Sequence, residues 1–145
     1  MAAPGDRTIS GHGSLVRFDE VFDSFEGKTR VYLNVDGRSG GEVGGSRAAH
    51  WMLLETAFAS LVSKQSTGLW SSHNDHALLN QTGKAALRGI SQEGLFIFHA
   101  NRASDINQVL QFSARHELSS VISGGQEAWI ARDALAEAGV PVVLN

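Results

Sequence analysis

The C-terminal third of the chain decides the fold. Residues 95–145 read LFIFHANRASDINQVLQFSARHELSSVISGGQEAWIARDALAEAGVPVVLN. Three short stretches with strand patterns, at 95–99, 119–122 and 141–144, alternate here with two stretches whose apolar residues have helical spacing. A continuous apolar run is typical of a parallel strand that is covered on both faces. The pattern therefore predicts an α/β fold, with a parallel sheet, flanking helices and right-handed βαβ crossovers.

The two stretches between these runs predict helices at 104–116 and 126–138. Ser104 is expected as the N-cap of the first helix, with Asp105 in its first turn, where a negative charge is favourable. Gly139 is expected at the C′ position of the second helix. The residues expected to face the core are Ile106, Val109, Leu110, Ser113 and Ala114 in the first helix, and Trp129, Ile130, Ala134, Leu135 and Ala138 in the second.

Three further segments have clear patterns. Residues 30–35 are apolar and β-branched, which predicts a strand. The spacing of apolar residues predicts a helix over about 46–64, with Ser46 as its N-cap, and a second helix over 75–90. Because strong patterns flank the glycine-rich segment after the strand, that segment is expected to be a loop within one domain, residues 1–145.

The N-terminal region has weaker signals. Residues 1–13 are glycine-rich and polar, and we expect them to be poorly ordered. Residues 14–18 are compatible with a short strand, and 21–27 with an irregular turn. Residues 1–8 lack the apolar core of a signal peptide, so the sequence leaves the compartment open: cytoplasmic, or periplasmic if a signal lies upstream.

Composition excludes several classes of function. The net charge of −3 and the pI near 6.0 give no basic stripe for nucleic acid. No run approaches the length of a membrane span. The chain has no cysteine, which excludes thiol catalysis, zinc–thiolate sites and disulfides.

His99 is the first candidate for chemistry. It follows four apolar strand residues, so it is expected at the carboxyl end of a parallel strand, where α/β proteins place their sites. A neutral imidazole there can bind a divalent metal or act as a base, or it can simply hydrogen-bond the neighbouring loop. Asn101 and Arg102 follow directly, and Arg102 could clamp a carboxylate. Alternatively, Arg102 pairs with Asp105, which then serves only the helix end.

Other motifs are weaker. The loop at 40–47 lacks both the dinucleotide-binding spacing and the lysine of a phosphate loop. The segment 72–76, with His73 and His76, fits a polar helix start better than a metal site. The remaining candidates are expected to have structural roles only. His12, His50 and His116 are expected as surface or helix-face residues, Glu127 as an acid in the first turn of a helix, and Trp129 as a core residue.

Three phrases in order carry a family likeness: FHANRASDI at 98–106, ISGGQEAW at 122–129 and AGVPVVL at 138–144. They resemble the barrel of bacterial amidohydrolases related to imidazolonepropionase. The likeness covers about residues 86–145 and is weaker over 45–62.

The resemblance implies a distorted (β/α)8, TIM-type barrel that binds one or two divalent metals, zinc first among them. The metal activates a water that attacks a C–N bond of an amide or cyclic amide. The family's usual ligands are a His-x-His pair on the first strand, a bridging ligand on the fourth, histidines on the fifth and sixth and an aspartate on the eighth. His99 matches the fifth-strand histidine, but no histidine follows the strand at 120–123 that would be the sixth.

The expected function follows from this likeness. The chain looks like a fragment of a metal-dependent amidohydrolase, inactive by itself, with His99 as a metal ligand and Asn101 and Arg102 as contacts to a small-molecule substrate. The alternative is a non-catalytic small-ligand-binding or assembly domain built from barrel units. A partial barrel exposes strand edges, so we expect the N-terminal segment or a second copy of the chain to cover them.

Overall fold

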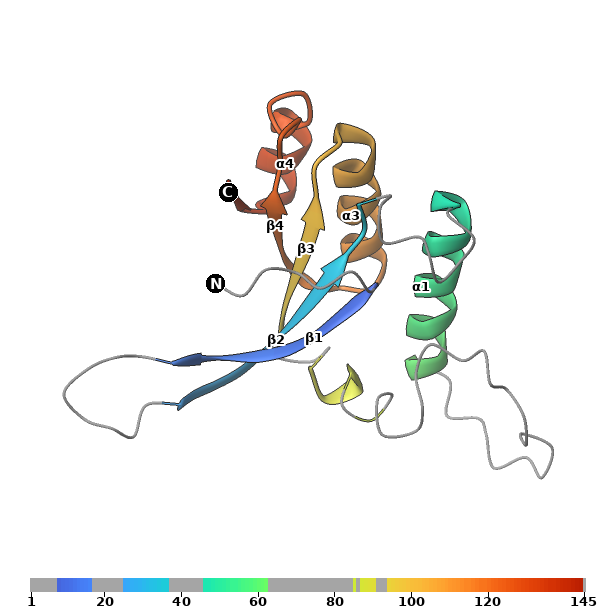
Figure 1. The fold of residues 1–145 in the computed structure, drawn as a ribbon, viewed down its shortest axis with the longest axis vertical. Helices are drawn as coiled ribbons and strands as arrows, with labels where there is room; N and C mark the ends of the chain where they lie inside the picture. Colours follow the sequence, from blue (N-terminus) through green and yellow to red (C-terminus); the bar gives the residue numbers. More distant parts are fainter. Residues whose placement is uncertain are drawn as a thin grey trace.

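A single sheet organises the computed structural model of the chain. The structure describes residues 8–16, 25–36, 46–62, 85, 87–90 and 94–144. The sheet order is β1-β2-β3-β4-β5 (Figure 1). The strands are β1 (Ile9–Val16), β2 (Phe25–Asn34), β3 (Leu95–Ala100), β4 (Ser119–Gly124) and β5 (Val142–Val143), and the helices are α1 (Arg47–Val62), α3 (Ala103–Arg115) and α4 (Arg132–Ala138).

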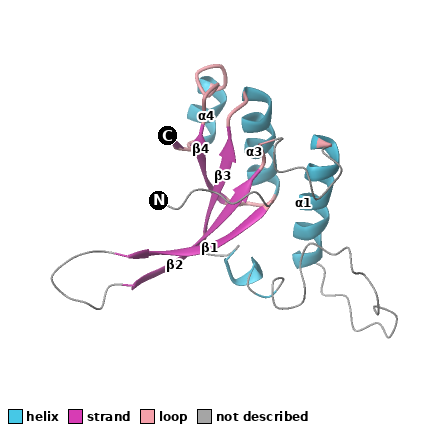
Figure 2. Cartoon of the chain, in the orientation of Figure 1, coloured by secondary structure: helices cyan, strands magenta, loops and turns pink. Residues whose placement is uncertain are grey.

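Strands β2 to β5 form a parallel sheet flanked by helices (Figure 2). This confirms the expected α/β fold and the lateral order of its four parallel strands. β1 pairs antiparallel with β2. The N-terminal segment therefore covers the outer edge of β2, as expected for a sheet that would otherwise leave that edge open.

One face of the sheet packs against the helices. Alternate residues of each strand point to this face, as strand geometry requires. Among the described residues, the resulting core cluster is apolar. Its strand residues are Val31, Leu33, Phe96, Phe98, Ala100 and Ile122, and its helix residues include Leu54, Phe58, Ile106, Val109, Phe112 and Leu135.

Phe112 lies at the centre of this core. Its ring is fully buried and meets Phe58 edge-on at a centroid distance of 4.9 Å. It also contacts Trp51 at 5.6 Å and Phe98 at 6.2 Å. These contacts join α1, β3 and α3. The sequence pattern had favoured Leu110 and Ala114 for the buried stripe of α3, but Leu110 is only half-buried and Ala114 is exposed.

The expected helix over 126–138 is wrong in its first half. Residues 126–130 form turns, and α4 begins only at Arg132. Trp129 is 70% exposed and Ile130 is 55% exposed, so neither belongs to the core. The cause is the neighbouring loop: the N–H of Gly125 donates to Ala100 O, and that of Glu127 donates to Asn101 O. These bonds hold the chain against the end of β3 before the helix can start.

Three other expectations need correction. β1 begins at Ile9, so five residues of the segment expected to be poorly ordered are in a strand, and β2 already begins at Phe25 within the expected irregular turn. Ser104 is not the cap of α3, which starts after Arg102 without a side-chain cap from that residue. His50 lies in α1, in agreement with its interpretation as a helix-face residue, and is 4% exposed.

The expected start of α1 and the expected end of α4 are confirmed. The Ser46 hydroxyl accepts a hydrogen bond from the Ala49 N–H at 3.4 Å, as an N-cap does. Gly139 ends α4 with a φ of 64°. Of the expected helix at 75–90, residues 85 and 87–90 are helical, and its other residues lie outside the described part. None of the described helices is long and apolar enough to cross a membrane.

Candidate functional site

A row of polar side chains lies across the carboxyl ends of three parallel strands. Asn34 aligns with His99, and His99 aligns with Ser123. Phe98, the neighbour of His99 in β3, packs toward α3. Because successive strand residues point to opposite faces, His99 and its row occupy the face away from the helices. This polar row, Asn34–His99–Ser123, is at the edge where parallel sheets place their sites.

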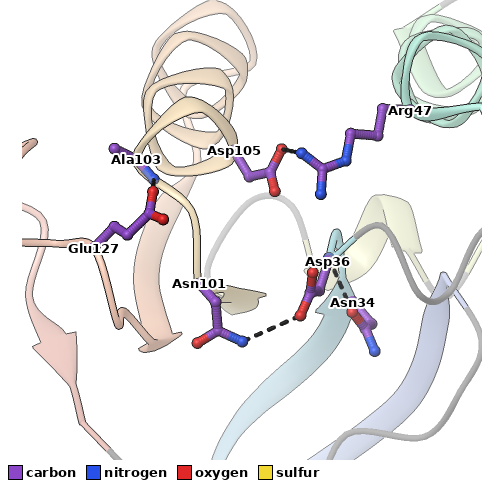
Figure 3. Close-up of polar contacts among 7 residues, drawn as sticks. All are labelled: Asn34, Asp36, Arg47, Asn101, Ala103, Asp105 and Glu127. Atoms are coloured by element: carbon purple, nitrogen blue, oxygen red, sulfur yellow. Dashed lines mark hydrogen bonds and ion pairs between the residues drawn. The ribbon is translucent and has the colours of Figure 1, made fainter.

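Two residues just beyond the row are connected to it. Asp36 and Asn101 each follow their row residue by two positions. The Asn34 Oδ1 accepts a hydrogen bond from the Asp36 N–H at 3.0 Å, and the Asn101 Nδ2 donates to the Asp36 Oδ2 at 3.1 Å (Figure 3). The same Nδ2 lies 3.4 Å from the His99 Nε2. The ends of β2 and β3 are thus joined by one amide.

His99 therefore makes the loop hydrogen bond that was one of its open interpretations. It is half-buried, and its Nδ1 is buried without a hydrogen-bond partner among the described residues. It does not pack in the helix layer, which is the placement that would have removed a site role. It lies beside Asn101 at the carboxyl end of β3, the strand end that the sequence pattern predicted.

Gly124 lies against the Asn101 and His99 side chains and leaves room for them because it has no side chain. It ends β4 with a φ of +99°, a conformation that residues with a side chain rarely adopt. A Cβ at this position would lie 2.6 Å from Asn101 Oδ1 and 3.1 Å from His99 Cε1. Both the backbone conformation and the close approach require glycine here.

A buried carboxylate at the start of α3 forms an ion pair with a partly exposed arginine. Asp105, in the first turn of α3, is 3% exposed and lies 3.3 Å from the Arg47 guanidinium. The expected partner, Arg102, does not form this pair, and its side chain is exposed. Burial raises the pKa of Asp105 above its ordinary value of 3.8, with Asp36 and Glu127 adding to the rise, while Arg47 and Arg102 oppose it.

Glu127 has a different role from the one expected. It lies in the turn before α4, and its Oε2 accepts a hydrogen bond from the Ala103 N–H at 2.9 Å (Figure 3). Ala103 is the first residue of α3. The carboxylate of one βα loop therefore caps the helix of the preceding unit, where a negative charge also favours the positive end of the helix dipole.

The described residues do not complete a metal site. A catalytic zinc needs about three protein ligands and an open position. No group of three or more histidine, aspartate or glutamate side chains that could hold a metal ion occurs within the described ranges. The two neighbours of His99 in its row, Asn34 and Ser123, are not among the side chains that zinc prefers. The segment 72–76 and most of the loop at 40–47 lie outside the described residues.

Sequence reasoning missed several residues of this site, Asp36 and Arg47 among them. Asp36 had a readable signal, because it follows the predicted strand at 30–35 as Asn101 follows the next strand. Arg47 had none, since only the packing of α1 beside α3 brings it to Asp105, 58 positions away.

Comparison with known proteins supports the fold. No protein-family model and no curated protein matches the sequence. The chain is similar in structure to an amidohydrolase from Thermotoga maritima MSB8, with a TM-score of 0.69 and 17% sequence identity. The match covers 95% of this chain and 39% of that chain. The fold, a four-strand parallel sheet with flanking helices, thus matches part of an amidohydrolase barrel.

Proposed function

We propose that this chain is a section of a metal-dependent amidohydrolase barrel that hydrolyses the C–N bond of an amide or cyclic amide. The observation that carries the proposal is the place of His99. It lies at the carboxyl end of β3, away from the helices, in a sheet that matches part of an amidohydrolase barrel. Barrel enzymes of this shape have their active sites at that end.

In this proposal His99 is one ligand of a divalent metal, zinc first among the candidates. Its described neighbours do not supply the other ligands, so we derive no catalytic step from them. Hydrolysis would need further ligands from residues outside the described ones. For the chain alone we therefore expect weak zinc binding and no efficient hydrolysis.

Asn101 and Arg102 are the proposed substrate contacts. Asn101 is at the rim of the sheet beside His99, and Arg102 is exposed at the start of α3. A guanidinium can bind a carboxylate through two parallel hydrogen bonds. A small substrate with a free carboxylate, such as an acyl-dipeptide or an imidazolone propionate, fits these two groups.

The experiment compares this chain with a longer protein that contains it. Hydrolysis of an acyl-dipeptide and of an imidazolone is measured with added zinc, for each protein and its His99→Ala variant. We expect no turnover by the chain and, in the longer protein, loss of most of the activity on substitution. Asn107→Ala, an exposed change on α3, is the matched control. Efficient turnover by the chain that needs His99, or full activity of the longer variant, would contradict the proposal.

A non-catalytic ligand-binding domain is the second candidate. The lack of a three-ligand group among the described residues favours it, as does the engagement of Asn101 and Asp36 with each other. This candidate predicts metal-independent binding of a small carboxylate, weakened by Arg102→Ala. Calorimetric titration with N-acetylglycine in the presence of a chelator separates the two candidates.

A further inference from the structure

The amide of Asn101 bridges a carboxylate and an imidazole. Its Nδ2 lies 3.1 Å from Asp36 Oδ2 and 3.4 Å from His99 Nε2. Its Oδ1 lies on the other side, over Gly124. The three side chains come from the ends of two neighbouring strands, so their mutual placement is fixed by the register of β2 and β3.

The chemistry of these groups fixes the direction of each bond. A carboxylate can only accept a hydrogen bond, so the amide must turn its NH2 group toward Asp36. That NH2 has a second hydrogen, and His99 Nε2 lies 3.4 Å from the same amide nitrogen. Two N–H groups cannot face each other, so Nε2 must carry a lone pair here and accept. In a neutral imidazole the proton then belongs to Nδ1.

We propose that Asn101, oriented by Asp36, is a positioning residue that holds neutral His99 in its Nδ1–H tautomer. This inference concerns the same site as the proposed function. The tautomer itself does not depend on that function; only its effect on metal binding rests on it. In this arrangement Nε2 is occupied by the Asn101 amide and Nδ1 carries a proton. Neither nitrogen offers a free lone pair to a metal.

The second ring nitrogen then carries a buried N–H. Nδ1 is buried and has no partner among the described residues. A buried N–H without a partner is unfavourable, and an acceptor atom would remove that penalty. A ligand oxygen can accept from this N–H only after the atoms that bury it move aside. Metal binding by His99 requires Asn101 to turn away first.

The tautomer can be measured in the metal-free chain. Two-bond proton–nitrogen correlation spectra of the histidine rings are recorded at about pH 8, where an ordinary histidine is neutral. The His99 signals are identified by backbone-based assignment and by their loss in His99→Gln. We expect a protonated Nδ1 and an unprotonated Nε2. A ring protonated at Nε2 would overturn the proposal.

Two variants test whether Asn101 is the cause. Asn101→Asp replaces the donor by an acceptor, so we expect the pattern to reverse, with the proton on Nε2. Asn107→Ala should leave the spectrum of His99 unchanged. If the pattern in Asn101→Asp equals that of the unchanged chain, Asn101 does not set the tautomer and the proposal fails.

Zinc binding separates this inference from the proposed function. Asn101→Ala frees Nε2 without adding a ligand, so the zinc affinity of the chain should rise. His99→Gln in the same background should abolish the gain. If Nδ1 carries the proton but His99→Gln does not change the zinc affinity, the metal role of His99 is refuted and the inference about its tautomer still holds. An unexpected tautomer would refute the inference whatever the zinc affinity.

Discussion

The two faces of the sheet are built from alternate residues of the same strands, yet they differ in chemistry. The face toward the helices is apolar and closed, with Phe98 and Phe112 fully buried. The opposite face ends in the polar row Asn34–His99–Ser123, where Asn34 and His99 hydrogen-bond Asp36 and Asn101 of the adjoining loops. The face toward the helices supplies the stability of the domain, and the opposite face positions the polar side chains of the candidate site.

The largest effect should come from the closed face. Phe112→Ala removes a fully buried ring that joins α1, β3 and α3, and we expect it to lower the free energy of unfolding by about 3–5 kcal/mol. Urea denaturation followed by circular dichroism measures the change. Gln111→Ala, its exposed neighbour, is the control and should change stability by less than about 0.5 kcal/mol. Equal effects of the two substitutions would remove the contrast between the faces.

The next effect should come from the polar edge. Gly124→Ala forces a side chain into a φ of +99° and against the Asn101 amide, and should cost about 1–3 kcal/mol. It should also shift the ring resonances of His99, because the new methyl group displaces Asn101. Gly89→Ala is an informative control, since this helical glycine has nothing within 4 Å and the change should stabilise the chain by about 0.5–1 kcal/mol.

Glu127 connects two βα units, and its loss should be milder. Glu127→Ala leaves the Ala103 N–H without its acceptor, and we expect a loss of about 1 kcal/mol, the usual effect of removing a helix cap. Glu127→Gln keeps an acceptor oxygen and should recover much of the loss. Thermal denaturation of the three proteins decides this, and identical values for alanine and glutamine would show that the cap contributes nothing.

Asp105 should change how stability depends on pH. Its folded pKa is raised above 3.8 by burial, so the folded chain holds this proton more tightly than the unfolded chain. Stability from this group is therefore present below pH 3.8 and is lost as pH rises through the raised folded pKa. Asp105→Asn should flatten that fall, as urea midpoints from pH 4 to 7 would show. An unchanged profile would mean that Arg47 fully compensates the burial.

The smallest effect is expected at Trp129. Its side chain is 70% exposed in the turn before α4, so Trp129→Ser should alter the free energy of unfolding by less than about 0.5 kcal/mol. If the free energy of unfolding fell by more than about 2 kcal/mol, Trp129 would be a core residue, as the sequence pattern predicts.

The sequence by itself determined the parallel sheet and the position of His99. Both follow from local patterns: continuous apolar runs indicate buried strands, and the first polar residue after such a run stands at the functional edge. The cap of α1 at Ser46 and the end of α4 at Gly139 are likewise local, because a side chain or a backbone conformation decides each within a few residues.

Only the tertiary structure decided the rest. Arg47 meets Asp105, and Glu127 caps α3, because packing brings together residues 58 and 24 positions apart. The turn that exposes Trp129 forms because the loop after β4 hydrogen-bonds the end of β3. The bridge from Asp36 through Asn101 to His99 depends on the register of two strands separated by more than sixty residues, which no local pattern contains.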